Sequence, residues 1–156
     1  MRILGIDPGL KLTGYGVIDW KFPTPSLIDA GVIRLKDKTP IPTRLVELEM
    51  ELDSIFKEHQ PEICAVEMLY AHYAHPRTAV LMGHARGVIL LVAQRNGARI
   101  EQLPANRIKQ SVTGHGHAGK GQVQRAIQAI WNLKDPPEPP DVADALAIAI
   151  TCGRQL

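Results

Sequence analysis

Four carboxylates stand at the edges of apolar runs, where a charged group is unfavourable to bury. They are Asp7, Glu67, Asp141 and Asp144. The first two directly follow short apolar runs, and the last two begin and interrupt an apolar stretch near the C-terminus. An ionised carboxylate in such a place needs a cation beside it. Because three separate segments carry the same anomaly, a shared divalent metal ion is the simplest common partner.

The chemistry that such a cluster supports follows from its ligands. Carboxylate oxygens favour magnesium or manganese over zinc or copper. Several carboxylates at close range repel one another unless cations intervene. Two magnesium ions in one site suit the in-line displacement of a phosphoryl group. The cluster therefore predicts a hydrolase of phosphodiester bonds with two Mg²⁺ ions, for which Mn²⁺ can substitute.

Local roles in chain geometry are the alternative for three of these acids. Asp141 is a candidate N-cap of the last helix, with Asp144 as its capping-box partner. Asp7 is a candidate cap of the turn at Pro8-Gly9. Glu67 is harder to explain in this way, since an apolar residue, Met68, follows it. Residue by residue, these alternatives stay open.

Charge is distributed very unevenly along the chain, although the net charge is only +2. Residues 68–134 contain nine Lys or Arg and one acid, so this basic block carries +8 and the remainder −6. Such a block beside an acidic cluster indicates a polyanionic partner near a cation site. Within it, Arg77, His115 and His117 are candidates for DNA contacts. Solvated helix faces are the alternative explanation.

Length and composition indicate one ordinary soluble domain over residues 1–156. Hydrophobic residues make up 45% of the chain, which is enough to fill a single core. No apolar segment is long enough to span a bilayer or resembles a secretory signal. Cys64 and Cys152 lie in apolar runs and are expected to be buried free thiols. These features predict a cytoplasmic protein.

Hydrophobic periodicity predicts an α/β fold in which a mixed sheet has helices on both faces. Strands are expected at residues 2–7, 14–20, 27–35, 63–66 and 99–103. Helices are expected at residues 43–60, 76–96, 104–112, 122–132 and 141–151. Ala79, Gly83 and Gly87 form a stripe of small residues, which predicts that a sheet or second helix approaches the second helix closely.

Several motifs, in order along nearly the whole chain, resemble those of the RuvC family of bacterial Holliday-junction resolvases. They are GIDPG at 5–9, TGYGV at 13–17, VE at 66–67, GHARG at 83–87, IKQSVTG at 108–114, KGQVQ at 120–124 and DVADALAIA at 141–149. The resemblance implies a ribonuclease-H-like fold with a five-stranded mixed sheet. It also implies a homodimer that makes two symmetric nicks in a four-way junction during homologous recombination and DNA repair. The family's partners are a branch-migration motor and its junction-binding subunit.

The resemblance also implies roles for individual residues. The family's metal ligands and catalytic acids fall on Asp7, Glu67, Asp141 and Asp144. Basic DNA contacts fall on Lys109 and Lys120, of which Lys120 is also expected to act in catalysis. An aromatic residue that contacts bases at the junction falls on Tyr70. The chain departs from the family pattern at Met68, His84 and Gly119 and in the length of the segment 70–83.

Three other functions are alternatives to junction resolution. A ribonuclease H acting on RNA–DNA hybrids shares the fold and the acids, and comparing cleavage of the two substrates separates them. An actin-like ATPase also has a Gly-x-Asp-x-Gly loop, but it needs two domains of this size. A non-catalytic junction-binding module would not need all four acids, and metal-dependent nicking would exclude it.

Overall fold

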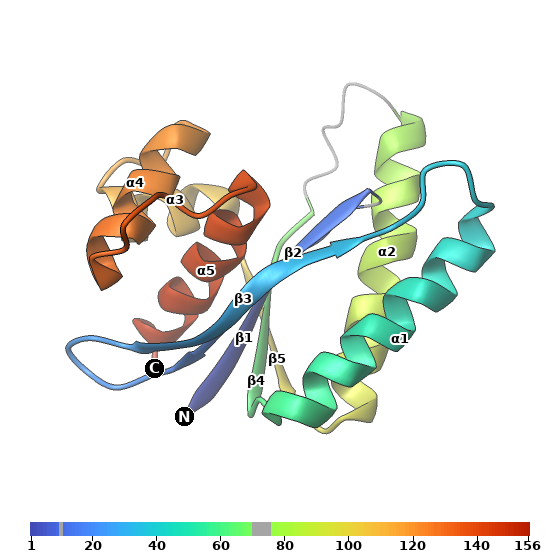
Figure 1. Cartoon of the computed structure of the whole chain (residues 1–156), viewed down its shortest axis with the longest axis horizontal. Helices are drawn as coiled ribbons and strands as arrows, with labels where there is room; N and C mark the ends of the chain where they lie inside the picture. The colour runs from blue at the N-terminus through green and yellow to red at the C-terminus, as the bar shows by residue number, and fades with distance from the viewer. Residues whose placement is uncertain (10, 70–75) are drawn as a thin grey trace.

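The computed structural model describes residues 1–9, 11–69 and 76–156. Within them, five strands and five helices succeed one another along the chain (Figure 1). They are β1 (Arg2–Asp7), β2 (Leu12–Asp19), β3 (Ser26–Arg34), α1 (Ile41–His59), β4 (Ile63–Glu67), α2 (Pro76–Arg95), β5 (Arg99–Leu103), α3 (Ala105–Thr113), α4 (Lys120–Trp131) and α5 (Pro140–Gly153). Each predicted element is present, with ends that differ by at most two residues from those expected. No helix in these described ranges is long and apolar enough to cross a membrane.

The strands form one sheet in the order β3-β2-β1-β4-β5. β1 to β3 form an antiparallel meander, and β4 and β5 run parallel to β1. The C-terminal ends of β1, β3, β4 and β5 therefore lie in a row with the start of β2, along the edge of the sheet that is formed by strand ends and not by an outer strand. We call this the carboxylate edge, because Asp7 ends β1 there and Glu67 ends β4 beside it.

Helices cover both faces of the sheet, as predicted. α1 and α2 lie on one face, and α3, α4 and α5 lie on the other (Figure 1). The central strand β1 contributes to both cores, since alternate side chains point to opposite faces. Leu4 packs in the core with Leu52 and Ile89, whereas Ile3 packs in the core with Leu146. Burial on both faces explains why this strand is apolar from Ile3 to Ile6 and does not alternate with polar residues.

Both cysteines are buried and free, as predicted. Burial is the main reason that the pKa of the Cys64 thiol rises to about 12 and that of Cys152 to about 11. Both thiols therefore stay protonated and unreactive at neutral pH. They serve as core residues.

The capping roles considered for three acids are wrong. Pro139 is the N-cap of α5, no side chain caps that helix, and Asp141 lies inside its first turn. The turn after β1 is closed by Thr13, whose hydroxyl donates to the Gly9 carbonyl at 2.8 Å. Among the described residues, the carboxylates of Asp7, Asp141 and Asp144 form no hydrogen bond or ion pair. Their positions therefore need another explanation.

Within the described part of the chain, no sheet or helix approaches the small-residue stripe of α2. Gly83 and Gly87 are exposed, and a Cβ atom added to either would meet nothing within 4 Å. α2 packs through its other side, where Ala85, Ile89 and Val92 are buried. The close backbone contacts at glycine lie instead on the other face of the sheet, at Gly5 and Gly14.

Candidate active site

The carboxylates of Asp7 and Glu67 are brought together by strand pairing. β1 and β4 are parallel neighbours in which Ile6 is paired with Val66. The next residue of each strand is an acid, so the two acids end adjacent strands at the same level. Strand neighbours are separated by about 4.8 Å, which places the two backbones within reach of one shared cation.

The other two acids arrive on α5, which lies against β1 and β2 at unusually close range. A Cβ atom on Gly14 of β2 would overlap the backbone oxygen of Asp141, and one on Gly5 of β1 would overlap that of Ala145. Only glycine at these positions lets the helix backbone rest directly on the strands. Asp141 and Asp144 are three residues apart and so share one helix face, which this contact turns toward Asp7.

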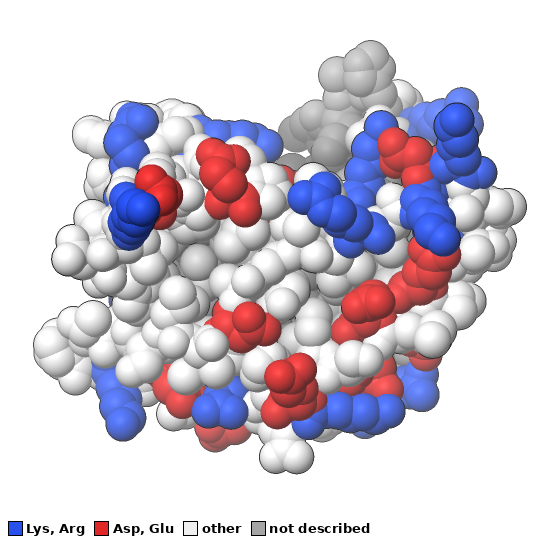
Figure 2. Space-filling view, in the orientation of Figure 1, with Lys and Arg blue, Asp and Glu red and all other residues white. Residues whose placement is uncertain are grey.

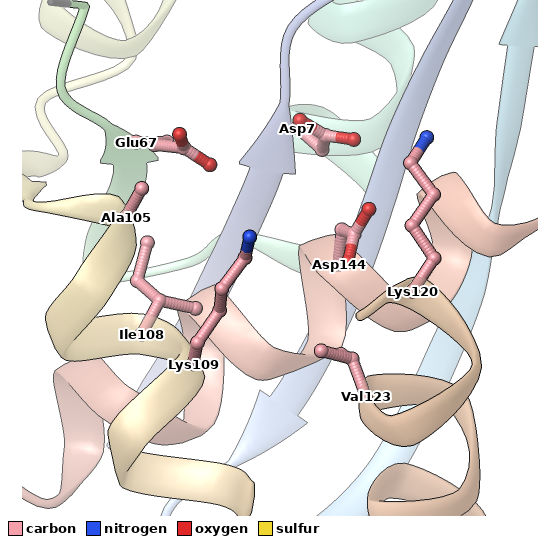
Figure 3. Close-up of a pocket in the computed structure, with 8 residues that line it drawn as sticks. All are labelled: Asp7, Glu67, Ala105, Ile108, Lys109, Lys120, Val123 and Asp144. Carbon is pink, nitrogen blue, oxygen red and sulfur yellow. The ribbon is translucent and has the colours of Figure 1, made fainter. Parts of the chain in front are cut away.

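A cavity of about 250 Å³ opens at this point of the carboxylate edge. Its acidic lining is Asp7, Glu67 and Asp144, and its basic lining is Lys109 from α3 and Lys120 from the start of α4. Figure 3 shows Lys109 extending between Glu67 and Asp144, and Lys120 extending on the side of Asp7. The rest of the lining is apolar and is made by Ala105, Ile108 and Val123.

The acids in this cavity hold protons unusually tightly. Burial, followed by the charges of Asp144, Glu67 and Asp141, raises the pKa of Asp7 to about 8, against the opposing effect of Lys120. Burial and Asp144 also raise the pKa of Glu67, while Lys109 and Arg86 oppose the rise. The four charges therefore act on one another as a single cluster, and the surrounding cations do not balance them.

The fourth acid, Asp141, belongs to the cluster without lining the cavity. Its charge contributes to the raised pKa of Asp7 and of Asp144. The structure thus places three of the four predicted acids around one cavity, and Asp141 is near enough for its charge to act on two of them. The donor set is entirely carboxylate oxygen, which fits a hard divalent cation. Over the described ranges, no three acidic, histidine or cysteine groups stand at the spacing of metal ligands.

Arg86 is a site residue that sequence reasoning missed, because it was counted among the basic block and given no place of its own. It comes from α2 but is only 7% exposed. Its guanidinium donates to the Glu67 carbonyl and to the side chain of Gln102 on β5. A buried cation thus supports the end of β4 from the face opposite α5. Its place in an apolar helical segment was the available signal, since an unpaired charge is rarely buried.

The remaining predicted DNA contacts are spread over the surface. A second hollow, of about 380 Å³, is lined by Asn106, Gly116 and His117 and shares Ala105 and Lys109 with the main cavity. His117 therefore lies beside the site. His115 is exposed, and its backbone is held by the Thr113 hydroxyl. Arg77 is exposed in the first turn of α2, and Tyr70 lies outside the described residues.

Comparison with known proteins points to one family. Residues 3–152 match the family model described as crossover junction endodeoxyribonuclease RuvC. The RuvC protein of Rhodopirellula baltica is 47% identical over 154 residues, covering 99% of this chain and 86% of that protein. The structure of Thermus thermophilus RuvC in complex with a Holliday junction substrate superposes with a TM-score of 0.90 at 32% identity, covering 97% of this chain and 92% of that one. The fold is shared with the yeast mitochondrial Holliday junction resolvase Ydc2, which superposes with a TM-score of 0.68 at 16% identity. That match covers 97% of this chain and 78% of Ydc2. The predicted ribonuclease-H-like fold is thereby confirmed.

Proposed function

The chain belongs to the RuvC family of crossover junction endodeoxyribonucleases, and from this premise we propose how its residues resolve a four-way DNA junction. As a member of the family it is a metal-dependent endonuclease that acts in recombination, and we extend this role to DNA repair. The observation that supports the assignment of the site is the convergence of Asp7, Glu67 and Asp144 with Lys120 in one cavity. We take residues 1–156 to be one nuclease domain.

Magnesium is the cation that we assign to this cavity, with two ions per site and manganese as a substitute. Asp7, Glu67, Asp141 and Asp144 would hold them, because their mutual repulsion leaves a deficit of positive charge. When bound, the metal supplies Lewis acidity and charge neutralisation for displacement at phosphorus. In the hydrolysis, the oxygen of a water bonds to phosphorus, the bond from phosphorus to O3′ breaks, and one water proton ends on O3′. The products are a 3′ hydroxyl and a 5′ phosphate, which a ligase can join.

The two lysines of the cavity have separate tasks in this proposal. Lys120 extends beside Asp7, where it can hold the scissile phosphate and stabilise the charge that develops on it (Figure 3). Lys109 lines both the cavity and the adjoining hollow, so it suits the phosphate next along the strand. His117 then contacts the strand as it crosses that hollow. We keep His115, Arg77 and Tyr70 as candidate DNA contacts, with Tyr70 assigned to bases at the junction.

Two cuts in one junction require two sites, and we propose that a homodimer provides them. The exposed face of α2 suits this contact, since Val80, Gly83, Gly87 and Leu91 repeat along one side of the helix. Val80 is 60% and Leu91 54% exposed, and the glycines allow a second helix to approach. Val80→Glu should yield a monomer by sedimentation, whereas Met50→Glu on the equally exposed face of α1 should not. The motor and its junction-binding subunit are the further partners, in the cytoplasm.

Cleavage of a synthetic mobile four-way junction tests the function directly. With Mg²⁺, the purified chain should introduce two nicks at symmetric positions in strands of like polarity. Asp7→Asn should bind the junction with nearly unchanged affinity and leave it uncut. Faster cleavage of an RNA–DNA hybrid would instead indicate a ribonuclease H. If the chain binds the junction tightly but makes no nick in Mg²⁺ or Mn²⁺, it is a non-catalytic junction-binding module.

A further inference from the structure

A second group of basic side chains lies outside the basic block, in the segment that connects β3 to α1. Residues 34–44 contain Arg34, Lys36, Lys38 and Arg44 but only one acid, Asp37. The net charge of the chain outside the basic block is negative, so that total gives no sign of this basic segment. Figure 2 shows Lys and Arg gathered at the upper right of the molecule, where Figure 1 places the β3–α1 connection.

This segment belongs to the carboxylate edge. Asp7 is paired with Gly14 of β2, and Gly14 is paired with Val32 of β3. Two strand spacings separate Asp7 from Val32, which is about 10 Å. Arg34 lies two residues beyond Val32, at the end of the same strand. Since Lys109 and Lys120 approach from α3 and α4, positive charge flanks the acids on both sides.

The connection is a braced turn that holds its backbone in one arrangement. The Lys36 carbonyl accepts from the Thr39 hydroxyl at 2.8 Å and from the Thr39 N–H at 3.2 Å. Arg44 is used for the bracing, because its Nε donates to the Thr39 carbonyl at 3.0 Å. The Leu35 N–H donates to the Lys11 carbonyl at 3.0 Å, which ties the turn to the start of β2.

Three of the cations in this turn are not used by the fold. Lys11 pairs with Asp37 at 3.1 Å, an exposed pair that stabilises little. Arg34, Lys36 and Lys38 are exposed and form no ion pair with any described residue. Arg34 and Lys36 share a hollow with Glu47 and Glu51 of α1, but at distances beyond an ion pair. We call these three residues the β3–α1 cluster.

We propose that the β3–α1 cluster binds the phosphate backbone of the junction arm that leaves the active site across β2 and β3. The inference rests on the proposed function, because it assumes that DNA occupies the carboxylate edge. Neutralising phosphates releases counterions, so such contacts strengthen binding and make it sensitive to salt. They lie too far from the acids to act on the reacting phosphate. The cluster therefore sets junction affinity and leaves the chemical step unchanged.

Binding of a fluorescent four-way junction over a range of salt concentrations, in Ca²⁺ to prevent cutting, tests this surface. Lys36→Gln with Lys38→Gln should weaken binding roughly tenfold and lower the slope of log affinity against log salt by about 2. The control is Lys21→Gln with Lys57→Gln, which removes the same charge from exposed positions outside the basic block, after the end of β2 and near the end of α1. That control should bind as the parent does. Single-turnover cleavage in Mg²⁺ at saturating protein should be equal in all three.

Each other outcome identifies which inference fails. If the parent binds and cuts junctions but both double variants keep its affinity and salt slope, the β3–α1 cluster does not contact DNA. An equal loss in both double variants would show a general charge effect and also overturn the proposal. If the parent neither binds nor cuts a junction, the proposed function itself fails. Equal thermal midpoints for the three proteins would exclude unfolding as the cause of weaker binding.

Discussion

The two helices beside the carboxylate edge, α5 and α2, are built in opposite ways. From Val142 to Gly153, α5 buries every residue except Asp144. The longer α2 buries a single side, made of Ala85, Arg86, Ile89, Val92 and Ala93. α5 is covered by the sheet on one side and by α3 and α4 on the other, whereas α2 is covered by the sheet and α1 and leaves one face to solvent (Figure 1).

This difference separates two tasks. A helix enclosed on all sides can occupy only one position. For α5, that position is fixed by the contact of its backbone with Gly5 and Gly14. Such a helix can hold two acids against Asp7 despite their repulsion. A helix enclosed on one side can still contribute a buried group, Arg86, while offering its other face to a partner. In the proposed function, α5 supplies two acids of the cluster, whereas α2 supplies Arg86 from its buried side and leaves its exposed face for the proposed dimer contact.

Asp144, one of the two acids on the enclosed helix, should be highly sensitive to substitution. Asp144→Asn removes one charge from the cluster and should lower the single-turnover cleavage rate roughly a thousandfold, which is about 4 kcal/mol of transition-state stabilisation. Junction affinity should change little, because Lys109 and Lys120 remain. His84→Asn, an exposed change on α2, is the matched control and should cut normally. Equal rates for both variants would remove Asp144 from the site.

The glycine contact should distinguish the two faces in stability. Gly14→Ala forces a methyl group into the Asp141 backbone and should lower the free energy of unfolding by about 3 kcal/mol, with loss of cleavage. Made in the monomeric Val80→Glu variant, Gly83→Ala places the same methyl group in open space on α2 and should raise the free energy of unfolding by about 0.5–1 kcal/mol. Urea unfolding measures both values. A neutral Gly14→Ala would show that α5 does not rest on β2 in solution.

The crowded acids should make stability depend on pH when no divalent metal is present. The pKa of Asp7 is about 8 in the folded chain, against about 3.9 when unfolded. A raised folded pKa means that the stabilisation is complete below about pH 4 and is lost as the pH rises toward 8. With EDTA, the free energy of unfolding should fall by a few kcal/mol between pH 5 and pH 8. Asp7→Asn should flatten this dependence, and Mg²⁺ should restore stability at pH 8; a parallel profile for the variant would contradict the assignment.

The support from α2 should have a smaller effect on catalysis than the acids themselves. Arg86→Met removes the bonds to the Glu67 carbonyl and to Gln102, and should reduce cleavage about 10- to 100-fold. Because the cation favours ionised Glu67, the variant should also need more Mg²⁺ for half-maximal activity. Arg86→Lys should recover part of the metal affinity, since it restores the charge without the forked geometry. An unchanged Mg²⁺ requirement would make Arg86 a purely structural residue.

Spacing along the chain was sufficient to predict the elements and most of the acidic cluster. Apolar runs of period two or near 3.6 residues reflect burial on a strand or a helix face, so element ends were placed within two residues. Asp7 and Glu67 could be expected together, because acids that end parallel central strands must share an edge. The three-residue spacing of Asp141 and Asp144 placed both on one helix face.

Other features of the site depend on contacts between segments that are far apart in the sequence. The spacing of residues along the chain does not predict such contacts. The glycines of α2 and those of β1 and β2 look alike in sequence, and only the packing shows that Gly14 contacts α5 while Gly83 contacts nothing. Arg86 and Lys36 likewise have the same charge, but one is buried beneath Glu67 and the other is exposed on the carboxylate edge. Local sequence specifies which face of an element is apolar. Which neighbour covers that face, and which charges it brings within range, is decided when the elements pack together.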